Sequence, residues 1–212
     1  MKCIILADKA PKKNKTKGWY GNHPINKKYT LIDNQILYLN KSFTQKNLDI
    51  IYVYGFDKKN VERHFVNNSK KYKNVSLVFN SEYERFGNSH SLGVGCKNAI
   101  DSNLLVFFGT TILKSSYFSD FDIKKSYIFT GNKQGEIGCS IDCFNKIENI
   151  AYDLDNGIHE IFHFNEHSIH DLHKLTTSHW YRNHFMFEII NKMIAKNIDF
   201  YAKKIDHQVF KR

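Results

Sequence analysis

Met1-Lys2-Cys3-Ile4-Ile5-Leu6-Ala7 opens the chain with an apolar run that stops at Asp8. Its continuous apolar part, Cys3–Ala7, predicts a strand buried on both faces, as in the centre of a parallel sheet. Further strands are expected at residues 50–54, 75–79 and 104–108, and helices at residues 36–43 (after an Asp33-Asn34 start signal), 61–66 and 88–99. Alternating buried strands and helices predict an α/β fold with right-handed crossovers and a mostly parallel sheet.

The second half of the chain has a different pattern. Short strands joined by brief turns are expected at Ser126–Thr130, Ile137–Phe144 and Ile147–Tyr152, which favours an antiparallel extension of the sheet. An apolar face at helical spacing predicts a helix over residues 185–196, and a last strand is predicted at residues 199–203. No internal repeat or domain boundary stands out. We therefore expect one domain over residues 1–212, with a Rossmann-like mixed sheet and helices on both faces.

The composition is that of a globular protein with a basic surface. Of the 212 residues, 42% are hydrophobic and 25% are charged, and the formal net charge is +10. Such a surface attracts polyanions such as nucleic acid, anionic membranes or nucleoside phosphates, although the many lysines and asparagines also fit an AT-rich genome. No nucleic-acid-binding motif accompanies the aromatic residues, so we expect no nucleic-acid partner.

Cysteine usage and hydropathy indicate the compartment. The four cysteines show no zinc-binding spacing, and Cys3 and Cys139 lie in apolar runs, as buried thiols of a reducing compartment do. There is no signal-peptide pattern, and no stretch approaches the roughly 18 apolar residues of a membrane span. We therefore expect a cytoplasmic protein with no membrane span.

Three turns of the chain are expected to meet at one edge of the sheet. In open α/β sheets, ligands bind beyond the carboxyl ends of the strands, where consecutive loops converge. The turns concerned are the loop after Ala7, the loop after Phe79 and Gly109-Thr110-Thr111. Together they predict one pocket of a size suited to a nucleoside phosphate.

The residues at these turns resemble those of the sugar-phosphate nucleotidylyltransferases. The N-terminal run, followed by Lys28-Tyr29-Thr30-Leu31-Ile32 before a helix, carries the general resemblance. Asn80-Ser81-Glu82-Tyr83, followed by Gly87-Asn88-Ser89-His90-Ser91-Leu92, is more similar to the choline-phosphate cytidylyltransferase branch. The late run Phe185–Lys196 with Ile198-Asp199-Phe200-Tyr201-Ala202 resembles the closing helix and strand of the family. This implies the nucleotide-diphospho-sugar transferase fold, with a nucleotide-binding half over residues 1–112 and an acceptor-side half over residues 113–212.

The resemblance also implies a reaction. A phosphomonoester would attack the α-phosphate of CTP or UTP, which transfers CMP or UMP and releases pyrophosphate. The acceptor would be a sugar phosphate or a phosphocholine-like compound, with a role in cell-surface polysaccharide biosynthesis. Such a reaction depends on cations at the triphosphate and on Mg²⁺ held by carboxylates.

Two alternatives stay open. A catalytically degenerate relative would bind a nucleotide or nucleotide sugar as a regulatory or partner protein, and a homodimer is possible in either case. A glycosyltransferase of related architecture would carry an Asp-x-Asp motif after the fourth strand. Asp120-Phe121-Asp122 and Asp153-Leu154-Asp155 both lie elsewhere.

The resemblance assigns candidate residues to the nucleotide. Lys13 stands near the arginine that ends the family's glycine-rich loop, while Lys9 and Pro11 stand where glycines are expected. Lys28 matches a lysine that reaches the phosphates, and Lys28 and Lys13 are the candidate catalytic residues. The alternatives are a solvated basic loop, a surface lysine and, for Asn88, a helix N-cap. The candidate nucleotide-binding residues are Leu6, Ala7, Asp8, Lys9, Asn80, Asn88, Ser91 and Gly109.

The expected metal site departs from the family pattern. Thr110 follows Gly109 where the family has a magnesium-binding aspartate, and a hydroxyl is a poor replacement for a carboxylate toward a hard cation. The second family carboxylate follows the last strand, where Asp206 is the nearest acidic residue. Asp8 is a candidate relocated ligand, so Asp8 and Thr110 are the candidate metal residues.

The acceptor side is marked by Trp180, Glu188 and a group of histidines. Trp180 and Glu188 are the candidate acceptor-binding residues. Six of the eleven histidines lie between His159 and His179, and neutral imidazoles bind transition metals. However, Ile161-Phe162-His163-Phe164 favours a strand, which would break a helical arrangement of ligands. The alternatives are a polar surface insertion or contact with an anionic acceptor.

Overall fold

The computed structural model describes residues 1–212 apart from residues 12–17, 45–47, 98, 132–135, 206–207 and 210–212. The strands are β1 (Lys2–Leu6), β2 (Asp49–Tyr54), β3 (Val75–Phe79), β4 (Leu104–Phe108), β5 (Thr111–Ile112), β6 (Ser126–Thr130), β7 (Ile137–Ile141), β8 (Ile147–Tyr152), β9 (Asn156–Phe164), β10 (Phe200–Lys204) and β11 (Gln208–Val209). The helices are α1 (Leu31–Ser42), α2 (Lys58–Asn67), α3 (Asn88–Cys96), α4 (Ile169–Thr177) and α5 (Met186–Ile194), with short 3-10 turns at Tyr20–Asn22, Ser115–Phe118 and His179–Tyr181.

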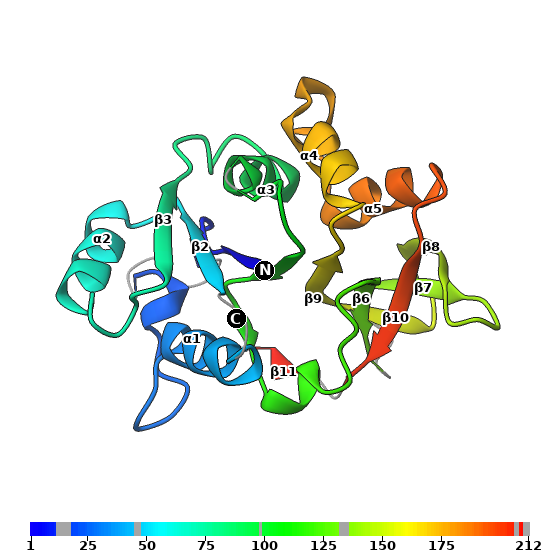
Figure 1. Cartoon of the computed structure of the whole chain (residues 1–212). Coiled ribbons are helices and arrows are strands. Elements are labelled where there is room, and N and C mark those ends of the chain that lie inside the picture. The colour runs from blue at the N-terminus through cyan, green and yellow to red at the C-terminus, as the bar shows by residue number, and fades with distance from the viewer. Residues whose placement is uncertain (12–17, 45–47, 98, 132–135, 206–207, 210–212) are drawn as a thin grey trace.

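The main sheet has the order β10-β6-β9-β4-β1-β2-β3, with β7 and β8 attached to it through β9. The strands β1 to β4 are parallel to one another, and β9 is antiparallel to both β4 and β6. The expected mixed α/β sheet is therefore confirmed, with β1 in the centre of the parallel part. Because β1, the dark blue strand in Figure 1, lies between β4 and β2, the loop after Ala7 begins at the carboxyl end of an interior strand.

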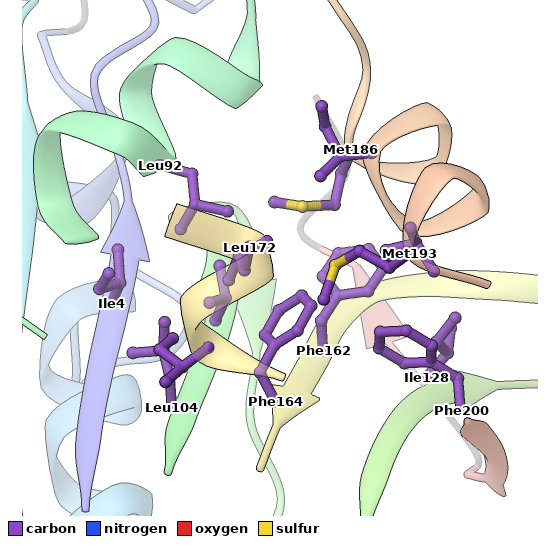
Figure 2. Packing of buried hydrophobic residues seen from close by; sticks show 14 of the residues in the cluster. Ile4, Leu92, Leu104, Ile128, Phe162, Phe164, Leu172, Met186, Met193 and Phe200 are labelled. Carbon is purple, nitrogen blue, oxygen red and sulfur yellow. The ribbon is translucent and has the colours of Figure 1, made fainter. Parts of the chain in front are cut away.

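Two hydrophobic cores cover the two faces of the sheet. Alternating side chains of β1 divide between them, because Ile4 and Leu6 belong to one cluster and Cys3 and Ile5 to the other. The first cluster packs β1, β4, β6 and β9 against α3, α4 and α5 (Figure 2), and the second packs the sheet against α1 and α2. Helices on both faces explain why the central strands are uninterrupted apolar runs.

Helix α1 begins earlier than its apolar spacing predicts. The Thr30 hydroxyl accepts a hydrogen bond from the Asp33 backbone N–H, and the Asp33 carboxylate accepts one from the Thr30 N–H. This reciprocal capping box makes Thr30 the N-cap. The prediction that Asp33-Asn34 precedes the helix is therefore wrong, because Asp33 is the third helical residue.

The second half forms one edge of the same sheet. The prediction of an antiparallel extension is confirmed for β7 and β8, which form a hairpin on β9. Strand β6 lies instead between β9 and β10, and it is parallel to β10. The sequence pattern predicts neither α4 nor the part of β9 that precedes Ile161.

The described histidines of the second half do not gather into a metal site. Within the described residues there is no group of three or more His, Cys, Asp or Glu side chains that could hold a metal ion. His163 is fully buried, with Nδ1 2.8 Å from the Lys125 carbonyl, so a polar surface insertion does not describe it. Burial lowers the pKa of His159 to about 4.

None of the helices in the described part of the chain is long and apolar enough to cross a membrane.

A polar cluster at the carboxyl ends of the central strands

A row of polar side chains continues the sheet face that carries α3 and α5. Leu6, Val78 and Phe108 point into the first hydrophobic cluster. Side chains alternate along an extended chain, so the residues two positions later face the same side. These are Asp8, Asn80 and Thr110. On the reversed strand β9, the matching residue is Glu160, two positions before the buried Phe162.

Asp8, Asn80 and Ser91 form a hydrogen-bonded junction. The Ser91 hydroxyl donates to Asp8 Oδ2 at 2.6 Å, and Asn80 Nδ2 donates to Asp8 Oδ2 at 3.1 Å and to Ser91 Oγ at 3.2 Å. All three side chains are buried, with only 1% of Asp8 exposed. A buried carboxylate is costly unless hydrogen bonds compensate its desolvation. The junction therefore joins the ends of β1 and β3 to α3, as the sequence predicts for these turns.

The loop between β3 and α3 is held from both halves of the chain. Lys9 Nζ donates to the carbonyl of Tyr83 and, at 2.6 Å, to that of Phe86. The backbone N–H of Gly87 donates to the Arg182 carbonyl at 3.0 Å. The two hydrogen bonds from the Lys9 ammonium therefore fix the conformation of this loop.

Helix α3 is capped by Gly87, and Asn88 is its first residue. The alternative interpretation of Asn88 as an N-cap is therefore wrong by one position. A Cβ on Gly87 would lie 3.1 Å from the backbone carbon of Asn183 and 3.2 Å from the His184 carbonyl oxygen, so the close approach to residues 183–184 favours glycine at the cap. No side-chain hydrogen bond caps the first turn.

The end of β4 lies directly against the end of β1. The Gly109 N–H donates to the Leu6 carbonyl at 2.7 Å, and a Cβ on Gly109 would lie 2.6 Å from the Ala7 Cβ. Only glycine fits this approach without a shift of the backbone. Thr110 and Asp8 thus follow adjacent strand ends, about 4.8 Å apart in the direction of strand pairing.

Gln35 in α1 supports this turn from the other face of the sheet. Its Nε2 donates to the carbonyls of Gly109 at 3.1 Å and Thr111 at 2.9 Å, and its side chain is fully buried. The sequence gives no sign of this role, because Gln35 is not part of any of the quoted motifs.

Thr110 contacts a second carboxylate at the carboxyl edge of the sheet. Its hydroxyl donates to Glu160 Oε2 at 3.1 Å, and 5% of Thr110 is exposed. Sequence reasoning misses Glu160, because the apolar pattern marks the strand only from Ile161 onward. A Mg²⁺ ion at a triphosphate is commonly held by one or two carboxylates together with phosphate oxygens and water. The donor set at this strand end, which includes a carboxylate beside Thr110, is compatible with such an ion. Asp206 lies outside the described residues.

The other predicted site residues are more dispersed. Lys28 is exposed on the turn before α1, with Nζ 5.2 Å from the centre of the Tyr29 ring. Trp180 is 83% exposed in the turn before α5. Glu188 accepts a hydrogen bond from the Phe185 N–H at 2.7 Å, which caps α5. Lys13 lies outside the described residues.

Two hollows in the described surface lie away from this edge. One, of about 320 Å³, is lined by residues at the start of β6 and β10, among them Lys125 and Tyr201. The other, of about 480 Å³, runs along α2 beside Trp19 and is lined by Asn60, Arg63 and His64. We place the candidate site at the strand ends, because the polar side chains from separate parts of the chain converge there.

Comparison with solved structures identifies the architecture. The chain is similar to the CTP:phosphocholine cytidylyltransferase of Streptococcus pneumoniae, with a TM-score of 0.78, 20% identity, and coverage of 98% of this chain and 91% of the other. It is also similar to a glucose-1-phosphate thymidylyltransferase, described as putative, from Bacillus anthracis (TM-score 0.78, 14% identity, coverage 98% and 88%). A third similar structure is the inositol-1-phosphate CTP transferase of T. maritima (TM-score 0.70, 13% identity, coverage 96% and 84%).

The chain has the nucleotidylyltransferase fold.

No protein-family model matches the sequence, and no curated protein matches it. The nucleotidylyltransferase fold is thus recognised through the arrangement of its strands and helices. The fold predicted from the strand-end motifs is confirmed over almost the whole chain.

Proposed function

We propose that this protein binds CTP or UTP at the carboxyl edge of its sheet and transfers CMP or UMP to a small phosphorylated acceptor. The observation that carries the proposal is the Asp8–Asn80–Ser91 junction beside the end of β4. It joins separate strand ends at the place where open α/β sheets bind ligands. Further support comes from the similar structures, whose names pair a nucleotidyl transfer with phosphocholine, glucose-1-phosphate or inositol-1-phosphate.

The nucleotide belongs on the side of β1, β3 and α3. The first turn of α3 has no side-chain cap, so its N–H groups are available to carbonyl or phosphate oxygens. Lys9 and Gly87 fix the preceding loop, and preorganised groups bind without a further ordering cost. Asn88 and the backbone after Ala7 are the groups that we assign to the nucleotide.

The acceptor belongs on the side of β8, β9 and α5. Gly87 contacts residues 183–184 just before α5, so the two helix starts lie next to each other. Exposed aromatic side chains surround the start of α5, with Trp180 83%, Phe185 54% and Tyr152 55% exposed. We assign Trp180 to the acceptor and Glu188 to the positioning of the α5 start.

The transfer itself depends on placement of charge. An oxygen of the acceptor phosphate forms a bond to the α-phosphorus, the bond from that phosphorus to the bridging oxygen breaks, and pyrophosphate leaves with the electron pair. The attacking phosphate is already an anion, so no general base is required. Mg²⁺, when bound, neutralises triphosphate charge, and Lys28 and Lys13 are the side chains that we assign to the phosphates. A cytoplasmic location suits these substrates.

One observation favours a second candidate function. The Lys9 ammonium donates hydrogen bonds to the Tyr83 and Phe86 carbonyls. Thr110 stands where the family that the sequence resembles has a magnesium-binding aspartate. A protein of this kind would bind a nucleotide or nucleotide sugar without turning it over, as a regulatory or partner protein.

An assay of pyrophosphate release separates the two functions. The protein is incubated with Mg²⁺, each of the four nucleoside triphosphates, and phosphocholine, glucose-1-phosphate or inositol-1-phosphate. The proposal predicts release that requires CTP or UTP together with one acceptor. Tight binding of a nucleotide or nucleotide sugar with no release for any pair supports the non-catalytic function, and the absence of binding for both kinds of ligand contradicts both functions.

A further inference from the structure

We propose that Glu160, oriented by Thr110, supplies the carboxylate that binds the divalent cation accompanying the nucleoside triphosphate. The inference rests on the proposed function, and it assigns a metal-binding role to a residue on a different strand from the expected aspartate.

The geometry of the sheet places Glu160 at the required edge. The register of β4 and β9 ends with Phe107 paired to Ile161, and Glu160 is the next residue of β9 toward the carboxyl end of β4. Phe108 and Phe162 both pack against the first hydrophobic cluster, and the hydrogen bond from Thr110 to Glu160 joins the residues beyond them at the carboxyl end of β4. The Glu160 carboxylate, from the neighbouring strand, therefore lies beside Thr110, the residue that stands in place of the expected aspartate.

The hydrogen bond fixes the orientation of this carboxylate. Thr110 is 5% exposed, and its hydroxyl donates to Glu160 Oε2 at 3.1 Å. A carboxylate offers about four lone-pair sites, so accepting a hydrogen bond from Thr110 is compatible with binding a cation. Ligating carboxylates are commonly oriented by hydrogen bonds of this kind. Thr110 is therefore a positioning residue, and the metal ligand is the side chain to which it donates.

The other carboxylate at this edge has a different role. Asp8 is 1% exposed, and its Oδ2 accepts hydrogen bonds from both Ser91 and Asn80. Those contacts bind it into the protein interior next to α3. Glu160 is half-buried, so it is the carboxylate that a bound triphosphate and its cation can reach.

The test measures metal binding rather than turnover. Calorimetry gives the affinity of CTP and of UTP with millimolar Mg²⁺ and with EDTA, and electron paramagnetic resonance measures Mn²⁺ binding to the protein saturated with the tighter nucleotide. Glu160→Gln keeps an oxygen that accepts from Thr110 while removing the charge. Thr110→Val removes the donor, Thr110→Ser restores it, and Glu148→Gln, an exposed carboxylate on β8, is the matched control.

We expect Glu160→Gln to reduce Mn²⁺ affinity, and the gain in nucleotide affinity from Mg²⁺, by about tenfold or more, with nucleotide binding in EDTA retained. Thr110→Val should cause a smaller loss that Thr110→Ser reverses, and Glu148→Gln should match the wild type. A full Mg²⁺ effect in Glu160→Gln overturns this inference and leaves the proposed function standing. If the wild type binds neither nucleotide, the proposed function and this inference fail together.

Discussion

Ser91 Oγ lies 2.6 Å from Asp8 Oδ2, although 83 residues separate them in the sequence. This contact joins the loop after the first strand to helix α3. A hydroxyl and a carboxylate that are both buried stabilise each other, and either one left alone would carry a desolvation penalty. The contact therefore contributes to both the fold and the proposed site.

Replacing Ser91 by Ala should destabilise the protein by about 1–3 kcal/mol, because Asp8 would lose its closest donor while remaining buried. Urea denaturation measures the change, and Ser69→Ala, at an exposed loop position, serves as the control with an expected change within about 0.5 kcal/mol. Adding Asp8→Asn should recover part of the loss. Equal stabilities of Ser91→Ala and the wild type would show that the junction contributes little.

Replacing Gly109 by Ala should destabilise the protein by about 1–3 kcal/mol, because the new Cβ would lie 2.6 Å from the Ala7 Cβ. Adding Ala7→Gly removes that contact and should restore part of the stability, although the Ala7 Cα would still lie 3.0 Å away. Thermal unfolding of the two single variants and the double variant measures this coupling. Strictly additive losses would contradict the close approach of the two strand ends.

His159 should make the protein less stable as the pH falls below about 6.5. Burial lowers its pKa to about 4 from an ordinary value of 6.5, so between these values the unfolded chain binds a proton that the folded chain does not. Urea midpoints at several pH values measure the slope. His159→Gln should reduce it, whereas His170→Gln, at an exposed position, should leave it unchanged. An NMR titration that places the His159 pKa near 6.5 would contradict the prediction.

Asp33 should stabilise the protein above its ordinary pKa of 3.8 and lose this effect in more acidic solution. Burial raises the pKa of Asp33, but hydrogen bonds from Lys71, Tyr72 and Thr30 outweigh burial and lower it overall. The folded chain therefore holds the proton less tightly than the unfolded chain, and the stabilisation disappears as the pH falls through the folded-state pKa. Asp33→Asn should be less stable than the wild type at neutral pH, with the gap narrowing below about pH 4. A gap that does not change with pH would contradict this account.

The sequence predicts the central part of the fold well because strands buried on both faces are continuous apolar runs. Strands β3, β4, β6 and β8 have the predicted bounds, β2 begins one residue earlier than predicted, and β1 begins and ends one residue earlier. The predicted start of α1 is too late because its cap, Thr30, precedes the apolar spacing that marks the helix. Most of β9 escapes prediction because it alternates apolar residues with His159 and Glu160 rather than forming an apolar run.

The candidate site could be predicted only where a residue stands inside a motif. Asp8, Asn80 and Ser91 lie at strand or helix ends, so the topology rule for open α/β sheets is enough to bring them together. Gln35 and Glu160 act through contacts between elements distant in sequence, and no local pattern marks them. Their roles depend on which strands are neighbours, which the sequence alone leaves open.

Hydrogen–deuterium exchange with and without CTP tests the central claim, that the nucleotide binds at the carboxyl ends of β1, β3 and β4. The affinity from calorimetry sets a saturating concentration, and UTP is used if it binds more tightly. The account predicts slower exchange in residues 80–91 and 109–113, with residues 58–68 of the α2 hollow unchanged. Protection confined to residues 58–68, or no protection at the strand ends under saturation, would contradict it.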